Sequence, residues 1–162
     1  MSELTHLDDK GRVRMVDVTQ KKISARTAVA QAVVHMSAEA FQQIAAGTVS
    51  KGNVLETARI AGVMAAKKTA DLIPMCHPLN LTHVQVDFFP DDAKHAIRIE
   101  GTARIVDQTG VEMEALTAVS VAALTLYDMC KAVDKAMTIT DICLIKKTGG
   151  KSGTFVRENP VP

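Results

Sequence analysis

Two pairs of charged side chains flank a long apolar segment, and their types and spacing are suited to proton transfer. Glu112 and Glu114 precede the segment, Asp128 and Lys131 follow it, and no side chain from 115 to 126 is ionisable. A spacing of three residues places Asp128 and Lys131 on one face of a helix. Such a pair can be a structural ion pair at a helix end. Beside apolar neighbours it can instead keep the carboxylate ionised, or let it exchange a proton with a substrate.

The two glutamates allow two interpretations. As acids in the first turn of a helix, Glu112 and Glu114 would complement the helix dipole. In an extended chain both side chains would point the same way and could accept the N–H groups of a guanine or pterin ring. Because a buried carboxylate is costly unless it is paired or hydrogen-bonded, we expect partners around these acids, and a catalytic pocket would supply them.

A basic, glycine-rich loop lies near the end of the sequence. The segment 146–157 contains Lys146, Lys147, Lys151 and Arg157 and no acid, and glycines at 149, 150 and 153 would let backbone N–H groups converge on a phosphate. It is not a Walker A loop, because Ile145 occupies the first glycine position and too few residues remain for the helix that should follow. The alternative to a phosphate site is a solvated, mobile tail.

A third candidate is the tripeptide Met75–His77, in a loop where Pro74 and Pro78 forbid helix. Histidine as a residue type can gain or lose a proton near neutral pH, so His77 could transfer a proton or contact a phosphate, and it could equally be a hydrogen-bonded structural residue. The three cysteines Cys76, Cys130 and Cys143 form no Cys-x-x-Cys pair, and with His77 they match no zinc finger or ribbon. We therefore expect no metal, and reduced thiols in a cytoplasmic protein.

The elements that would position these residues follow from the periodicity of the apolar side chains. Two alternating segments across a short turn predict an antiparallel hairpin, and the long apolar segment predicts a helix that is buried all round. Small residues around Gly62 predict a thin helix that another backbone can approach closely. We predict strands over 28–36, 82–89, 96–106 and 138–146, and helices over 37–47, 53–69 and 112–134.

This order, β-αα-β-β-α-β, predicts an α+β fold of the ferredoxin-like, split βαβ type, with an antiparallel sheet and helices on one face. A length of 162 residues with 47% hydrophobic side chains suits a single domain over 1–162. We expect residues 1–15 to form a mobile arm, and residues 147–162 to form a mobile basic loop and tail.

Bulk composition argues against two classes of partner. The net charge is +1, and aromatic residues make up 3% with no Trp, so neither a broad basic surface nor stacking platforms for nucleic acid are expected. No uninterrupted apolar stretch reaches the roughly 18 residues of a membrane span, because Thr117, Ser120 and Thr125 interrupt the long helix. We expect no nucleic-acid partner and no membrane segment.

Four long segments resemble the molybdenum cofactor biosynthesis protein C family, the cyclic pyranopterin monophosphate synthases. They occur in the family's order and span nearly the whole chain, together with Met15–Val18 near the start. The segments are Lys51–Gly62, Asp71–Leu79, Thr109–Thr117 with Leu126–Ala132, and Gly149–Gly153.

The resemblance implies a lyase reaction without a redox step or an organic cofactor. The substrate would be the nucleotide 3′,8-cyclo-7,8-dihydroguanosine 5′-triphosphate, and the products cyclic pyranopterin monophosphate and pyrophosphate. The imidazole part of the base would be opened, the pterin ring rebuilt and a cyclic phosphate closed. The resemblance also implies a homohexamer, a trimer of dimers, with sites at the dimer interface.

The resemblance also assigns roles to residues. Asp128 would be the catalytic acid and base, with Lys51 and Lys131 as pocket lysines. Two loops would bind the substrate, and further cations would neutralise the triphosphate. The implied substrate-binding residues are Met75, Cys76, His77, Glu112, Met113, Glu114, Lys67, Lys147 and Arg26.

Two other functions stay open on the residues alone. One is a non-catalytic regulator that senses a phosphate ligand with the glycine–lysine loop. The other is a zinc-dependent hydrolase that uses Cys76 and His77, which would require stoichiometric metal in the purified protein.

Overall fold

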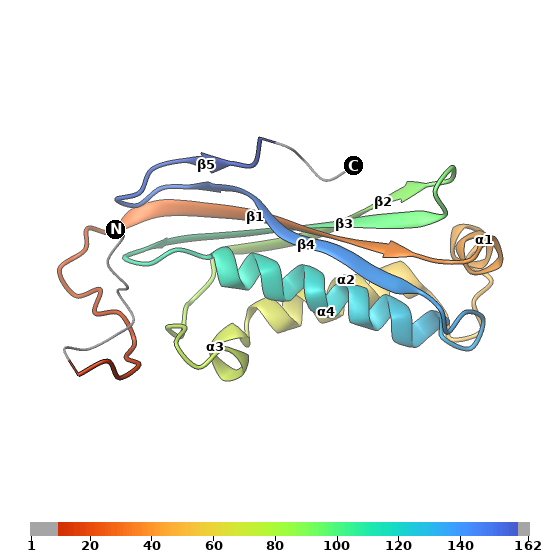
Figure 1. The fold of residues 1–162 in the computed structure, drawn as a ribbon, viewed down its shortest axis with the longest axis horizontal. Helices are drawn as coiled ribbons and strands as arrows, with labels where there is room; N and C mark the ends of the chain where they lie inside the picture. Colours follow the sequence, from red (N-terminus) through yellow and green to blue (C-terminus); the bar gives the residue numbers. More distant parts are fainter. Residues whose placement is uncertain (1–9, 159–162) are drawn as a thin grey trace.

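The computed structural model describes residues 10–158, which form one five-stranded sheet covered by helices on one face (Figure 1). The strand order is β2-β3-β1-β4-β5, and every neighbouring pair is antiparallel. The strands are β1 (Ser24–His35), β2 (His83–Asp91), β3 (Ala96–Asp107), β4 (Thr138–Thr148) and β5 (Phe155–Val156). The ferredoxin-like α+β fold predicted from the element order is therefore confirmed.

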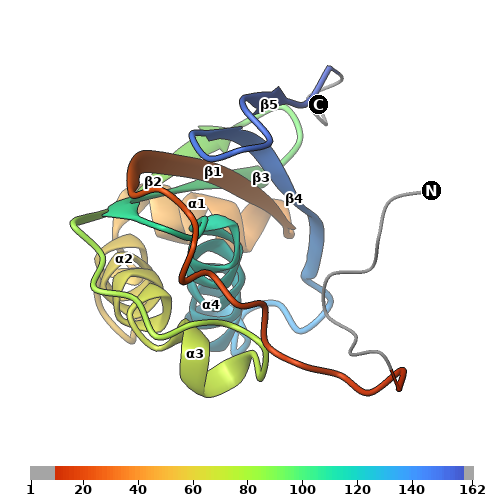
Figure 2. The same cartoon turned by 90° about the vertical axis from the view of Figure 1, so that its left-hand side faces the viewer.

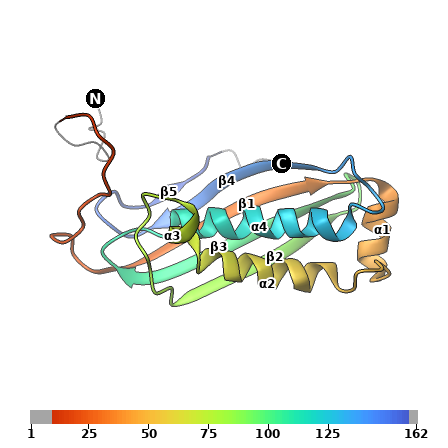
Figure 3. The same ribbon diagram turned by 90° about the horizontal axis from the view of Figure 1, so that it is seen from below.

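The helices are unequal in size and position. They are α1 (Ala38–Ala46), α2 (Val54–Ala66), α3 (Thr69–Leu72) and α4 (Glu112–Cys130). The long helices α2 and α4 lie side by side under the sheet, and α1 lies at one end of it (Figures 1 and 3). Seen along the strands, the same two helices fill one side of the sheet, and no helix of residues 10–158 covers the other (Figure 2).

The core forms where the inward residues of the sheet meet α4. The predicted alternation on β3 is confirmed, because Ile97, Ile99 and Ile105 are all buried against the helices. Helix α2 comes close to α4 at Gly62, where an added Cβ would lie 2.9 Å from the carbonyl oxygen of Ala118. The predicted close approach at the thin helix is thus confirmed, and a larger residue there would push the two helices apart.

Helix α4 is not buried all round, so that prediction was wrong. One side packs on the sheet and another on α2, but Leu124 is 58% exposed. The polar side chains within the helix are satisfied locally, since Ser120 and Thr125 donate to the carbonyls of Leu116 and Val121 at 2.8 Å. Among the described residues, α4 is the one helix long and apolar enough to cross a membrane. Half of this segment is buried inside the fold, and the core helix of a globular domain meets the same criteria.

Several predicted boundaries differ from the structure by a few residues. Helix 53–69 ends at Ala66 and is followed by the separate turn α3, helix 112–134 ends at Cys130, and the first strand begins at Ser24. Residues 1–9 and 159–162 lie outside the described part, so the mobility of arm 1–15 and tail 147–162 stays a prediction. Within that tail, Phe155 and Val156 pair with β4, which the sequence analysis did not anticipate.

Candidate functional site

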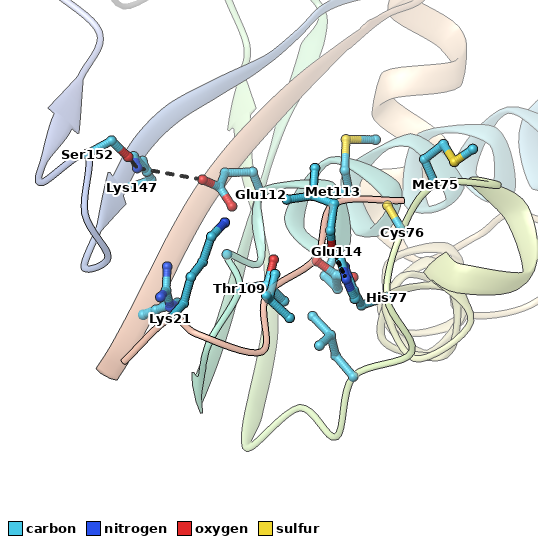
Figure 4. Close-up of a pocket in the computed structure, with 15 residues that line it drawn as sticks. Lys21, Met75, Cys76, His77, Thr109, Glu112, Met113, Glu114, Lys147 and Ser152 are labelled. Carbon is cyan, nitrogen blue, oxygen red and sulfur yellow. Dashed lines mark hydrogen bonds and ion pairs between the residues drawn. The ribbon is translucent and has the colours of Figure 1, made fainter. Parts of the chain in front are cut away.

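A cavity of about 340 Å³ opens at the N-terminal end of α4, and we call it the pocket (Figure 4). Five segments that are distant in sequence meet there: residues 16–21, the start of β1, the loop before β2, residues 109–114 at the start of α4, and residues 147–152 at the end of β4. Eight of the predicted site residues line it: Arg26, Met75, Cys76, His77, Glu112, Met113, Glu114 and Lys147.

Glu114 is the buried acid of the pocket. Its side chain is 4% exposed, because it lies four residues before the buried Ala118 on the inward face of α4. Burial, aided by the negative charge of nearby Glu112, raises the pKa of Glu114 to about 7. The group can therefore hold or release a proton close to neutral pH, which is a property of catalytic acids. Burial and the charge of Glu114 also raise the pKa of the Cys76 thiol.

The raised pKa predicts a stability effect. Between pH 4.5 and about 7 the unfolded chain releases the Glu114 proton while the native state keeps it, so the free energy of unfolding falls as pH rises. Glu114→Gln cannot ionise and escapes this penalty. We expect the variant to match the native protein near pH 4.5 and to exceed it by about 3 kcal/mol at pH 8, as measured by urea unfolding at one protein concentration.

The matched control is Glu56→Gln. The Glu56 side chain is 55% exposed and pairs with Arg59, so its removal should produce no comparable gain in stability between pH 5 and 8. Parallel pH profiles for native protein and Glu114→Gln would contradict a protonated, buried Glu114.

His77 joins the N-terminal segment to the pocket. Its Nε2 lies 2.8 Å from the carbonyl oxygen of Val16, and because a carbonyl can only accept, Nε2 carries the proton. In the neutral ring Nδ1 is then the acceptor. The contact holds Val16 and Val18 against the pocket, so His77 is both hydrogen-bonded and part of the pocket wall, and the two interpretations of this residue are compatible.

Lys147 lies between an acid and a hydroxyl group. Its Nζ is 3.9 Å from Glu112 Oε1 and donates to Ser152 Oγ (Figure 4). The Lys147 side chain is only 17% exposed, so its charge is poorly screened at the pocket wall. A phosphate that displaces the distant carboxylate would gain a strong, charge-assisted contact with this lysine.

Lys67 borders a second cavity, which shares a wall with the pocket. That cavity, about 440 Å³, is lined by Lys67 and Lys68 on one side and by His77 and Glu114 on the other. A ligand in the pocket therefore has a second group of cations next to it, beyond His77.

The three predicted catalytic residues form a separate group, which we call the lysine–aspartate cluster. Lys131 Nζ lies 2.6 Å from Asp128 Oδ1, and Lys51 Nζ lies 3.3 Å from Oδ2. Lys51 also donates to the Asp128 carbonyl at 2.7 Å. Hydrogen bonds from Lys131 and then Lys51 lower the pKa of Asp128, and the same contact raises the pKa of Lys131. The carboxylate is thus ionised at neutral pH, as expected beside two lysines.

Asp128 is not buried in the single chain, contrary to expectation. Its side chain is 58% exposed, because it lies on the outward side of the last turn of α4, whereas Met129 and Cys130 in the same turn are buried. Asp128 and Glu112 are at opposite ends of α4, and 16 residues of helix at 1.5 Å each separate them by about 24 Å. The structure therefore brings the predicted residues together in two separate groups, the pocket and the cluster, which lie at opposite ends of α4 in one chain.

Several residues that line the pocket were not among those predicted from the sequence. Lys21 adds a cation, Thr109 and Ser152 add hydroxyl groups, and Val16 and Val18 add apolar wall. The last two lie in the Met15–Val18 segment that the resemblance included, which was a usable signal. Nothing in the composition of the segment around Lys21 distinguishes that residue from a solvated lysine.

Metal-binding geometry is not found among residues 10–158, where no three His, Cys, Asp or Glu side chains are grouped to hold an ion. The three cysteines are free thiols, as predicted. Cys76 lines the pocket, whereas Cys130 is at the far end of α4.

Comparisons with known proteins agree over nearly the whole chain. A model of the MoaC family matches residues 15–150. A protein of Desulforapulum autotrophicum named cyclic pyranopterin monophosphate synthase is 65% identical over 98% of this chain and 97% of its own length. Proteins with the same name from Desulfatibacillum aliphaticivorans and Heliobacterium modesticaldum are 63% and 55% identical, each over 98% of this chain and 99% of its own length.

Proposed function

The chain belongs to the MoaC family, and from that premise we propose that it is a lyase of molybdenum cofactor biosynthesis, a cyclic pyranopterin monophosphate synthase. It converts 3′,8-cyclo-7,8-dihydroguanosine 5′-triphosphate to cyclic pyranopterin monophosphate and releases pyrophosphate. The observation that supports this most directly is the pocket, where a buried acid with a pKa near neutrality lies beside a histidine and a lysine that is mostly buried.

The pocket suits the base of such a substrate. Glu112 and Glu114 supply carboxyl groups for ring and amino N–H groups, and Met75 and Met113 supply polarisable apolar surface. Opening one ring and closing another requires protons to move between nitrogen and carbon atoms. Glu114, which titrates near pH 7, and His77 can hold and release these protons.

The cations around the pocket suit the triphosphate. Lys147 and Lys21 line the pocket, and Lys67 lies beyond His77. Closing the cyclic phosphate forms one P–O bond at the α-phosphorus and breaks the bond to the departing pyrophosphate. Positive charge placed beforehand stabilises the negative charge that builds up on this leaving group.

We place the catalytic Asp128 opposite the pocket of a second subunit. The pocket and the lysine–aspartate cluster are at opposite ends of α4, so a two-fold axis that crosses the middle of the helix would bring each cluster to the partner's pocket. The outer sides of α2 and α4 expose Ile60, Met64 and Leu124 by 64%, 49% and 58%, which is apolar surface available for an interface. A hexamer of three such dimers, and a cytoplasmic location, stay predictions.

Product analysis tests the proposed function. Purified protein is incubated with the cyclised dihydroguanosine triphosphate, and we expect cyclic pyranopterin monophosphate and pyrophosphate in equal amounts, identified by mass spectrometry and phosphorus NMR. Recovery of unchanged substrate by a folded, oligomeric protein that binds it would favour the regulator instead.

Lys147→Ala tests the role of the cations. Removing one charged contact to a phosphate costs roughly 1.5–3 kcal/mol, so KM should rise about 10- to 100-fold. The plot of log KM against log salt concentration should also become less steep, because one screened contact is gone. Lys94→Ala, which breaks a surface pair with Asp91 in the β2–β3 turn, is the control and should change neither quantity. An unchanged salt slope in Lys147→Ala would contradict the phosphate contact.

A further inference from the structure

Arg26 makes two hydrogen bonds to the backbone that precedes α4. From the start of β1, its Nε donates to the carbonyl oxygen of Asp107 and its Nη2 to that of Gln108, both at 2.9 Å. These carbonyls end β3 and begin the short connection to α4. That connection carries Thr109, Gly110 and then Glu112 into the pocket. The guanidinium group therefore fixes the position of one side of the pocket.

The same guanidinium group lies under the β4–β5 loop. Gly149 and Gly150 have φ of +88° and +76°, and an added Cβ would overlap the carbonyl oxygen of Ala25 at the first position and Arg26 Nη1 at the second. Only glycine fits both the backbone conformation and this close approach. The loop is thus seated on Arg26, and it carries Lys147 and Ser152 at its two ends into the other side of the pocket.

The connection before α4 and the β4–β5 loop meet with almost no space between them. The cavity that remains between Arg26, Gly110, Glu112, Lys147 and Gly149 is about 10 Å³. This is room for about one water molecule and too little for a phosphate group.

We propose that Arg26 is a positioning residue, which ties the connection 107–112 to the loop 147–152 so that Glu112 and Lys147 face the substrate in a fixed relation. Its planar fork suits this role, since Nε and Nη2 bind adjacent carbonyls while Nη1 supports the loop. The role differs from direct neutralisation of the triphosphate, which the resemblance implied for this residue. The kinetic part of the inference rests on the proposed function, whereas the structural part does not.

Amide hydrogen exchange tests, without any substrate, whether Arg26 holds the two segments in position. Arg26→Lys and Arg26→Gln both remove the guanidinium group and its two hydrogen bonds to the backbone. Both should therefore raise the amide exchange rate in segments 107–112 and 147–153 together, by about 10-fold or more. Exchange in α1 should not change. The matched control is Arg98→Lys, on the opposite half of β3, where an arginine of similar exposure pairs with Glu100. It should leave both segments unchanged.

Kinetics separate positioning from charge. If Arg26 positions the site, Arg26→Lys should lose about as much kcat/KM as Arg26→Gln, roughly 10- to 100-fold, since a small misplacement is costly. Gly150→Ala, which keeps the arginine charge but lifts the loop, should cause a similar loss, and the double variant should be no worse than either.

Two results would overturn the inference. One is an Arg26→Lys variant that keeps most of its kcat/KM while Arg26→Gln loses it, which would make Arg26 a charged ligand of the substrate. The other is unchanged exchange in either segment in both variants. If the native protein has no synthase activity, the exchange result still decides whether Arg26 ties the two segments.

Discussion

Asp128→Asn should abolish turnover while the protein stays folded, with kcat lowered by about 10²- to 10⁴-fold. Two lysines hold this carboxylate ionised, so it begins the reaction as a base and can take a proton from the substrate. The amide has nearly the same shape and can still accept a hydrogen bond from Lys51, but it cannot take up a proton. Because the side chain is 58% exposed, its replacement should leave the midpoint of urea unfolding almost unchanged.

The measurement is single-turnover kinetics together with substrate binding by calorimetry. Binding should remain within a few-fold of the native value, because the pocket side of the site is intact. Asp91→Asn is the matched control, since Asp91 also lies in a surface ion pair, 3.9 Å from Lys94, but belongs to neither the cluster nor the pocket. A fully active Asp128→Asn protein would remove the catalytic assignment and favour a regulator, in which only ligand binding matters.

Periodicity was sufficient for most of the fold. Alternation along β3 identified its buried face. The predicted start of a helix at residue 53 agrees with α2, where the Asn53 side chain accepts from the Glu56 amide at 3.1 Å. The β1–β4 pairing contains register shifts that no local pattern specifies. The position of β5 depends on how β4 continues past the expected end, and that is a tertiary effect.

The same helical periodicity could have predicted that Glu112 and Glu114 lie on different sides of α4. Glu114 is four residues before Ala118 and three before Thr117, both buried, so it lies on the inward face of α4. Glu112 is two residues earlier, on another side of the helix, and it pairs at long range with Lys147. The spacing therefore contained the difference between a buried acid, Glu114, and a partly exposed one, Glu112, for which the sequence had suggested a shared role.

The role of Arg26 was not accessible from sequence in the same way. Its hydrogen bonds are to backbone carbonyls of Asp107 and Gln108, about 80 residues away. They depend on the register of β1 against β3, which pairs Ser24 with Asp107. A cation near a glycine-rich loop suggests a phosphate ligand, and only the structure shows two of its donor groups already used.

Mixing two inactive variants should restore activity if each site is built from two subunits. Asp128 and Lys51 belong to one cluster in one chain, so a mixture of Asp128→Asn with Lys51→Ala should stay inactive. Asp128→Asn mixed with a pocket variant, Glu114→Ala, should recover activity. In a dimer with a two-fold axis, each site takes its pocket from one chain and its cluster from the other. Each mixed dimer then contains one site with both substitutions and one site with neither.

The recovery has a calculable size. Random re-association makes about half of the dimers mixed, and half of their sites are intact, so about a quarter of native activity should return. The subunits are mixed in mild denaturant, dialysed and assayed, and the fraction of mixed dimers is determined by native mass spectrometry. Asp128→Asn mixed with Lys131→Ala is the control, since Lys131 lies 2.6 Å from Asp128 in the same chain. No recovery with Glu114→Ala, in dimers shown to be mixed, would mean that the pocket and the cluster of one chain serve the same site, against the roughly 24 Å that α4 puts between them.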